Sequence, residues 1–291
     1  MSAEEYISLQ YGGVNSNDML DMYGSEEVPT YTPSRNSNYN KKKETSMSEI
    51  NHHLDPTDAI ALYKGQKSML ILIIAKSGRG KSTAIRNLDP KETFLINILG
   101  KPLPFPKGGQ YQEKDNMLVS TDAAKIRTTM MEVSRNEKWK NLVIDDGHYV
   151  MATEFMMKAL EKGYEKFTMM AKNIFEIILL TTKLRPGLKV FFLTHEEDTG
   201  TERKMKTLGK LLDDKVTLEG LSSIVLFGEV FSENDKQMYY FATQSNGYTT
   251  AKSPYDMFPN RIPNDLELVS KRIDEYYSGV DLKDSKCDFT L

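Results

Sequence analysis

Residues 69–83 of this 291-residue chain read MLILIIAKSGRGKST, and the rest of the sequence is organised around them. The six apolar residues 69–74 have the composition of a strand that is buried on both faces. A tight polar loop follows, and the apolar pair Ala84 and Ile85 then predicts a helix that begins at Lys81. Strand, glycine-containing loop and helix, in this order, are the context in which Gly-Lys-Ser is typical of a phosphate-binding P-loop.

The loop predicts a nucleotide site in which each residue type has a task. Its backbone N–H groups can surround a polyphosphate, and the helix N-terminus adds partial positive charge. We expect the Lys81 ammonium to contact the β- and γ-phosphates and the Ser82 hydroxyl to bind Mg²⁺. The usual pattern opens with glycine, but Ala75 stands there, which restricts φ at the start of the turn. The predicted nucleotide-binding residues are Lys76, Ser77, Gly78, Arg79, Gly80, Lys81, Ser82 and Thr83.

Composition and charge limit the classes of protein to which the chain can belong. The net charge is −3, so contact with nucleic acid would need a local basic surface. Cys287 is the only cysteine, which excludes an intramolecular disulfide and fits a reducing compartment. The longest apolar run is too short to span a bilayer, and no signal peptide is visible. We therefore expect a cytoplasmic protein with no membrane partner.

The chain divides by pattern into an arm, a domain and a tail. Residues 1–64 predict a polar, flexible arm, since much of this stretch is rich in Asn, Ser, Gly, Pro and Tyr and lacks apolar periodicity. Residues 65–278 alternate strand-like and helical runs, which predicts an α/β domain with a mostly parallel sheet flanked by helices. Within it, residues 238–250 predict a hairpin with an Asn-Gly turn, and residues 265–277 predict a helix. Residues 279–291 are expected to form a flexible tail.

A second informative stretch, residues 141–146, reads NLVIDD and predicts a buried strand that ends in two carboxylates. In P-loop enzymes an acid at this point holds Mg²⁺ opposite the P-loop hydroxyl, a role that we assign to Asp145. Asp146 is expected to point elsewhere and to polarise the attacking water. A strand end followed by a helix cap is the structural alternative. The next helical pattern, over residues 152–184, places Met156 and Leu160 at core spacing, with a break at Gly163.

Residues 189–194, KVFFLT, predict a further buried strand, and polar residues stand at its tip. Thr194 and His195 are candidates for sensing the γ-phosphate, with a purely structural histidine as the alternative. His148, just after the two aspartates, is expected to be structural.

Residues 200–215 begin polar and basic and then take a helical pattern. Their position after the strand at 189–194 suits a loop that contacts DNA or reaches the nucleotide of a neighbouring subunit, as arginine fingers do. A solvated helix face explains the same charges. The candidates for a DNA contact or a trans-acting charge are Arg203, Lys204, Lys206 and Lys210.

The segments AKSGRGKST, NLVIDD, VFFLTHEE, KTLGKLLDDK and TTAKSPYDMF together resemble the RecA-like P-loop ATPases (AAA-domain family) of tailed bacteriophages, and most closely their Sak-type single-strand annealing ATPases. The resemblance covers about residues 67–277 and implies that residues 65–278 form a RecA-like ATPase domain. It implies ATP and Mg²⁺ as cofactors and single-stranded DNA as a partner. It also implies a homo-oligomer, ring or filament, a phage or host single-strand binding protein as a further partner, and the cytoplasm of a bacterial host.

The function that follows is a DNA-dependent ATPase that promotes annealing or recombination during phage replication. Its predicted catalytic residues are Lys81, Asp146, His195 and Glu196. Bacterial recombinase takes its water-activating glutamate from the end of the second core strand, but residues 96–98 here, Ile-Asn-Ile, contain no acid. The base would then be Asp146 or Glu196. The alternative is a nucleotide-switched loader or scaffold for replication proteins with little hydrolysis. A small-molecule kinase is a weaker third option, since no arginine-rich lid is visible.

Overall fold

The computed structural model describes residues 68–208, 212, 216–233, 235–278 and 285–291. The described residues all belong to one of the two units into which the chain divides, Leu54–Leu291. The predicted arm and the candidate Lys210 lie outside the described residues. The predicted boundaries of the arm and the tail stay a prediction. Within the predicted tail, Phe289 packs edge-on against Phe258, with 5.9 Å between the ring centroids.

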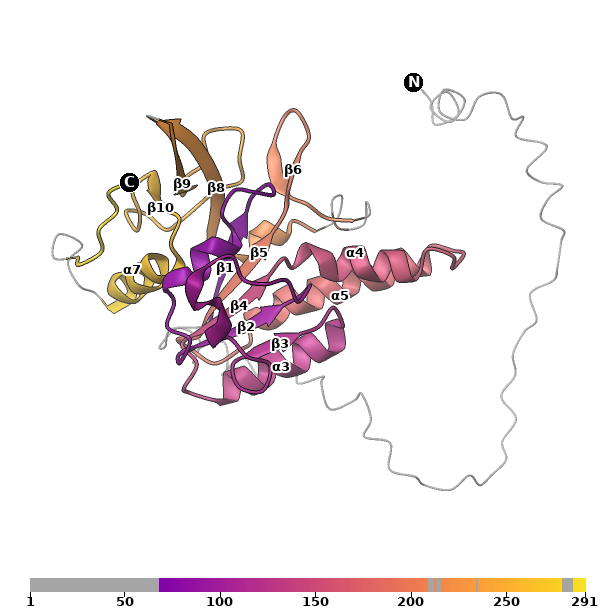
Figure 1. The fold of residues 1–291 in the computed structure, drawn as a ribbon. Coiled ribbons are helices and arrows are strands. Elements are labelled where there is room, and N and C mark those ends of the chain that lie inside the picture. The colour runs from indigo at the N-terminus through magenta and orange to yellow at the C-terminus, as the bar shows by residue number, and fades with distance from the viewer. Residues whose placement is uncertain (1–67, 209–211, 213–215, 234, 279–284) are drawn as a thin grey trace, which may run out of the picture. The chain divides into compact units, whose positions relative to one another are not determined.

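An eight-stranded sheet forms the centre of the described region, in the order β10-β9-β8-β1-β5-β4-β2-β3 (Figure 1). The six strands from β8 to β3 are parallel, and β9 and β10 join one edge antiparallel. A separate antiparallel pair, β6 and β7, follows β5. The strands are β1 (Met69–Ile74), β2 (Thr93–Asn97), β3 (Met117–Val119), β4 (Asn141–Asp145), β5 (Lys189–Thr194), β6 (Glu196–Asp198), β7 (Arg203–Met205), β8 (Ile224–Glu233), β9 (Lys236–Ala242) and β10 (Arg261–Pro263).

Helices cover both faces of the sheet. Alternate residues of β1 point to opposite faces, so Leu72 packs in one apolar cluster with α3, α4 and α5, and Ile73 packs in the other with η2 and α7 (Figure 1). None of the described helices is long and apolar enough to cross a membrane. The helices are α3 (Ala123–Arg135), α4 (His148–Met157), α5 (Glu165–Thr181) and α7 (Leu266–Ser278), with short 3-10 helices η2 (Ser82–Asn87), η3 (Pro106–Gln110) and η4 (Leu218–Leu221).

The strand order confirms the predicted α/β fold with a mostly parallel sheet flanked by helices, and it is consistent with the predicted RecA-like core. The P-loop strand β1 is central, and β5 lies between β1 and β4, the strand that carries the two aspartates. Asp122 caps α3, because its carboxylate accepts hydrogen bonds from the backbone N–H groups of Ala124 and Lys125. The break at Gly163 is also present, with φ +97° between α4 and α5.

Three local predictions were wrong. The hairpin joins β8 and β9, with Glu233 paired to Lys236, whereas the residues after the Asn-Gly turn pair with Arg203 and Val225. The P-loop helix is a six-residue 3-10 helix, so its N-terminus offers less dipole than a full α-helix would. Met156 and Leu160 are exposed, Leu160 by 98 %, and α4 ends at Met157, so the helical pattern that placed Leu160 in the core does not continue that far.

Gly147 tests the packing of α4 against the sheet. A Cβ at this position would lie 2.2 Å from the ring of Phe192, so Gly147→Ala should lower the free energy of unfolding by about 2 kcal/mol, the usual cost of overpacking. Urea denaturation measures this. Gly109→Ala is the control, since its Cβ would meet nothing within 4 Å. Equal stability of the two variants would contradict the packing described.

Candidate nucleotide-binding site

The P-loop connects β1 to η2 and has the backbone that a phosphate cradle needs. Gly78 and Gly80 both have positive φ, +77° and +78°, which side chains rarely adopt. Ala75, which replaces the usual first glycine, is not among the positive-φ residues, and it is fully buried. Its methyl group faces Gly228 of β8, where a Cβ would lie only 2.8 Å away. Gly228 of β8 is therefore the small residue that leaves room for the Ala75 methyl group.

Lys81 points back into the loop. Its Nζ donates hydrogen bonds to the backbone oxygens of Ala75 at 3.0 Å and Lys76 at 3.1 Å. Burial lowers the pKa of this ammonium, although the nearby Asp146 and Asp145 oppose the shift. The Lys81 side chain is thus buried against the P-loop backbone, close to the place where phosphates would lie.

Ser82, just after the P-loop, and Asp145, at the end of β4, bring two potential metal-binding oxygen atoms together. The Ser82 hydroxyl donates a hydrogen bond of 3.0 Å to Asp145 Oδ1. Burial, with the adjacent Asp146 charge, raises the pKa of Asp145 to about 6. A buried carboxylate beside a hydroxyl fits Mg²⁺, a hard cation that prefers oxygen ligands and would offset the buried negative charge. The two residues predicted as metal ligands are therefore adjacent.

Asp146 faces the opposite way from its neighbour. It adopts a left-handed backbone, φ +61°, which aspartate tolerates better than most residues. Its carboxylate accepts a hydrogen bond from Lys101 Nζ and lies 3.5 Å from His195 Nε2. Burial alone would raise the pKa of Asp146, but the interactions with His195 and Lys101 hold it well below its usual range.

A pocket of about 540 Å³ lies over the P-loop. Asp146 is the only acid among the described residues that line it, so of the two predicted bases only Asp146 faces the space where a nucleotide would bind. The residues that line it are Ser77, Gly78, Gly80, Lys81, Ser82, Thr83, Arg86, Lys101, Pro104, Asp146, Tyr149, His195, Gln237, Met238, Tyr239 and Asn264.

The two sensor candidates at the tip of β5 differ in position. His195 lines the pocket beside Asp146. Thr194 is fully buried, and its hydroxyl has no hydrogen-bond partner among the described residues. His148 packs edge-on against Tyr149 and His195. Burial lowers the pKa of His148 to about 4, so its ring is neutral near pH 7, in agreement with a structural role.

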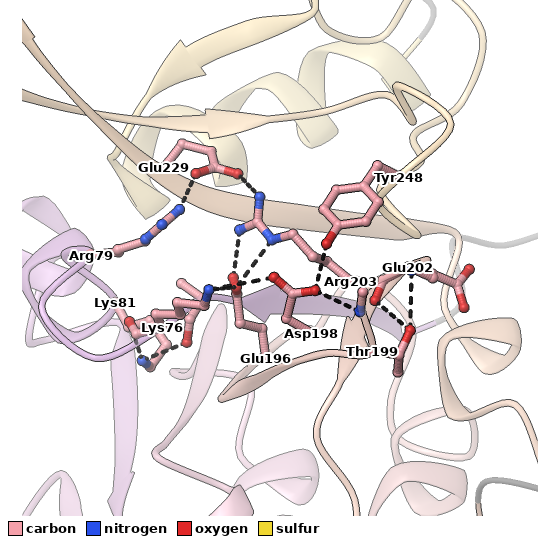
Figure 2. Close-up of polar contacts among 12 residues, drawn as sticks. Lys76, Arg79, Lys81, Glu196, Asp198, Thr199, Glu202, Arg203, Glu229 and Tyr248 are labelled. Atoms are coloured by element: carbon pink, nitrogen blue, oxygen red, sulfur yellow. Dashed lines mark hydrogen bonds and ion pairs between the residues drawn. The ribbon is translucent and has the colours of Figure 1, made fainter.

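Glu196 does not reach the pocket, because Arg203 holds it elsewhere (Figure 2). The guanidinium makes a bidentate pair with the fully buried Glu196 carboxylate, at 3.0 Å from Nε and 2.6 Å from Nη2. A second carboxylate, Glu229, also accepts from Arg203 and contacts Arg79 of the P-loop. Lys76 Nζ lies 3.5 Å from Glu196. We call these five residues the P-loop ion-pair cluster.

The cluster bears on two predictions, which stay predictions. To act as a catalytic base, Glu196 would have to leave its ion pair with Arg203, and Arg203 would have to leave the same pair to act in trans or on DNA. Lys206 is exposed, and its backbone N–H donates to the carbonyl oxygen of His195 at 2.9 Å. Lys204 is half-buried in β7 and has an interaction of its own.

Half of the residues that line the pocket were not predicted from the sequence, and Lys101, Tyr239 and Asn264 are three of them. Lys101 follows a turn in which Asn97, the last residue of β2, donates to the Lys101 carbonyl oxygen at 2.8 Å. Lys101 follows β2, which is the parallel neighbour of β4, and parallel strands end at the same edge of a sheet. This position in the sequence could have predicted that Lys101 lies near Asp145 and Asp146. Tyr239 and Asn264 carried no such signal, since they come from antiparallel additions far along the chain.

Comparisons with known proteins give a fold likeness alone. No family model matches the chain, and no curated protein is similar to it. Among solved structures with a similar backbone is a KaiC-like protein from the hyperthermophilic archaeon Pyrococcus horikoshii OT3, with a TM-score of 0.44 and 11 % identity. The alignment covers 68 % of this chain and 85 % of that one. A likeness of this degree carries no function from one protein to the other.

Arg203 tests the cluster. Arg203→Ala leaves the carboxylates of Glu196 and Glu229 without their shared partner, and the free energy of unfolding should fall by about 3 kcal/mol. Chemical denaturation of the full chain measures the loss. Lys172→Ala, which removes a surface pair with Glu176, should change stability by less than about 0.5 kcal/mol. A fully stable Arg203→Ala protein would contradict a stabilising role for the P-loop ion-pair cluster.

Proposed function

We propose that this protein binds ATP with Mg²⁺ in the P-loop pocket and hydrolyses it. The observation that supports this best is the 3.0 Å contact between Ser82 and Asp145 beside the buried Lys81. Lys81 would exchange its two carbonyl partners for phosphate oxygens. Ser82 and Asp145 would hold Mg²⁺, which would supply positive charge to offset the negative charge that develops during phosphoryl transfer.

Asp146 is the candidate that orients the attacking water. It is the one acid among the described residues that line the pocket, whereas the neighbouring Asp145 is hydrogen bonded to Ser82. Lys101 and His195 both hold that carboxylate. A γ-phosphate entering the pocket offers Lys101 a second, more highly charged partner. If Lys101 moves to the phosphate, Asp146 keeps only His195 as a partner and becomes a stronger base toward water.

We further propose that the protein binds single-stranded DNA as a homo-oligomer, ring or filament, and promotes annealing or recombination in phage replication. A phage or host single-strand binding protein is its expected partner. Lys206 supports the DNA part of the proposal. Its side chain is exposed, and its backbone N–H donates a hydrogen bond to the carbonyl oxygen of His195. A contact made at Lys206 could thereby displace a pocket residue, which would couple DNA binding to ATP turnover.

A nucleotide-switched loader or scaffold for replication proteins is the second candidate. It is favoured by the two contacts that hold Asp146 and by Asn97, which stands at the end of β2 where bacterial recombinase has its glutamate. With its one pocket acid engaged, the site would bind ATP and hydrolyse it slowly.

Steady-state ATPase assays with and without single-stranded DNA distinguish the two candidates. We expect DNA to stimulate turnover, and Asp146→Asn to lower the stimulated kcat by at least about 100-fold, the range of general-base catalysis. Asp115→Asn is the control, because Asp115 is an exposed surface acid. A rate near zero with and without DNA, in a protein that binds ATP tightly, would favour the loader or scaffold.

Charge reversal tests the DNA contact. Lys204→Glu combined with Lys206→Glu should weaken single-strand binding and reduce the slope of log K against log salt by about 0.7 for each DNA phosphate that the protein no longer neutralises. Fluorescence anisotropy at several salt concentrations gives both values. A double reversal at the exposed Lys125 and Lys183 carries the same change in charge and should have little effect. Unchanged affinity and slope in the first variant would remove Lys204 and Lys206 from the DNA surface.

A further inference from the structure

The pocket extends to both sides of the P-loop strand, and the sides differ in chemistry. On the side of β5, β4 and β2 lie the charged groups Lys101, Asp146 and His195. On the side of β8, β9 and β10 lie Tyr239 and Asn264, whose side chains approach Gly80 so closely that a Cβ there would meet them at 3.1 and 3.2 Å. A triphosphate with its γ end toward Asp146 has its nucleoside end toward Tyr239 and Asn264.

Asn264 has a buried donor with no partner. Only 3 % of the residue is exposed, and its Nδ2 has no hydrogen-bond partner among the described residues. The backbone is fixed from two directions, since Asn264 N–H donates to Tyr239 O at 3.3 Å and Arg86 Nη1 donates to Asn264 O at 2.6 Å. A buried, unpaired amide costs free energy until an acceptor arrives, so the site favours a ligand that brings one.

Tyr239 supplies an aromatic face next to this amide. The residue is 38 % exposed within the pocket wall, and its hydroxyl donates to Gln237 Oε1 at 2.8 Å, which restrains the orientation of the ring. Aromatic side chains stack on nucleobases of every kind. An asparagine amide adds selectivity, because its donor and acceptor match N7 and N6 of adenine, whereas guanine presents two acceptors on the same edge.

We propose that Tyr239 and Asn264 form a purine-base subsite that selects adenine: the ring stacks on the base, and the amide pairs with its N6 and N7. The inference rests on the proposed function, because it takes the triphosphate to lie on the P-loop. It assigns nucleotide selectivity to the antiparallel addition β9–β10 and the turn that precedes α7.

Calorimetric titration of the full chain with Mg²⁺ and either ATP, GTP or inorganic tripolyphosphate tests the subsite. Asn264→Ala should weaken ATP binding about tenfold, leave tripolyphosphate binding unchanged and reduce the preference for ATP over GTP. Tyr239→Ala should do the same to ATP, and Tyr239→Phe, which keeps the ring, should bind like the wild type. Asn260→Ala removes an exposed amide and is the matched control. Thermal unfolding establishes that each variant is folded.

The outcomes separate the subsite from the P-loop. Lys81→Ala should weaken both ATP and tripolyphosphate, since both depend on the loop. Unchanged ATP affinity in Asn264→Ala and Tyr239→Ala would overturn the subsite and leave the proposed function intact. An equal loss of ATP and tripolyphosphate binding in Asn264→Ala would assign Asn264 to support of Gly80 and would also overturn it. A wild-type protein that prefers GTP contradicts the adenine assignment, and one that binds none of the three ligands ends both proposals.

Discussion

The central strand β1 is hydrogen bonded in parallel register on both sides, to β5 and to β8, and the whole site depends on this arrangement. Parallel strands run in one direction, so the P-loop after β1, Asp145 at the end of β4 and Thr194 at the end of β5 meet at one edge of the sheet. The register is fixed because both faces of the sheet are buried. A slip of one residue would turn every side chain of β1 to the opposite face.

The positive charges of the P-loop are all engaged within the described part of the chain. Lys76 and Arg79 contact the carboxylates of β6 and β8, and Lys81 is bonded to backbone oxygens. Arg203 joins these acids into one cluster, so the loop, the β6–β7 hairpin and β8 are linked by charge as well as by packing (Figure 2). A triphosphate bound in the P-loop would replace some of these contacts. The free energy lost with them would make its binding free energy less favourable.

The same competition bears on turnover. Asp146 is held by Lys101 and His195, which come from the loop after β2 and from the tip of β5. Two cationic or hydrogen-bonding partners stabilise the carboxylate and make it a weaker base. Whatever moves Lys101 or His195 therefore changes the reactivity of the site. The backbone N–H of Lys206 donates to the carbonyl oxygen of His195, so a displacement of Lys206 would be passed to this pocket residue.

The sequence by itself determined the parts of the protein that depend on neighbours along the chain. The apolar runs of β1, β4 and β5, the glycines of the P-loop and the Asp122 cap each have a local cause, namely side-chain burial, backbone freedom or a nearby donor. The fold class, the P-loop and the pair Ser82 and Asp145 followed from these, because parallel strands bring their ends together.

Only the tertiary structure decided which charges face the pocket. Glu196 and Asp146 both follow buried strands, yet one is paired with Arg203 and the other lines the site. Lys101, Tyr239 and Asn264 enter the pocket from distant segments, and the hairpin forms between β8 and β9 instead of at the Asn-Gly turn. Such choices depend on long-range pairing and on the balance of buried charge. Neither leaves a periodic pattern in the sequence, because both are properties of residues that meet only after the sheet has formed.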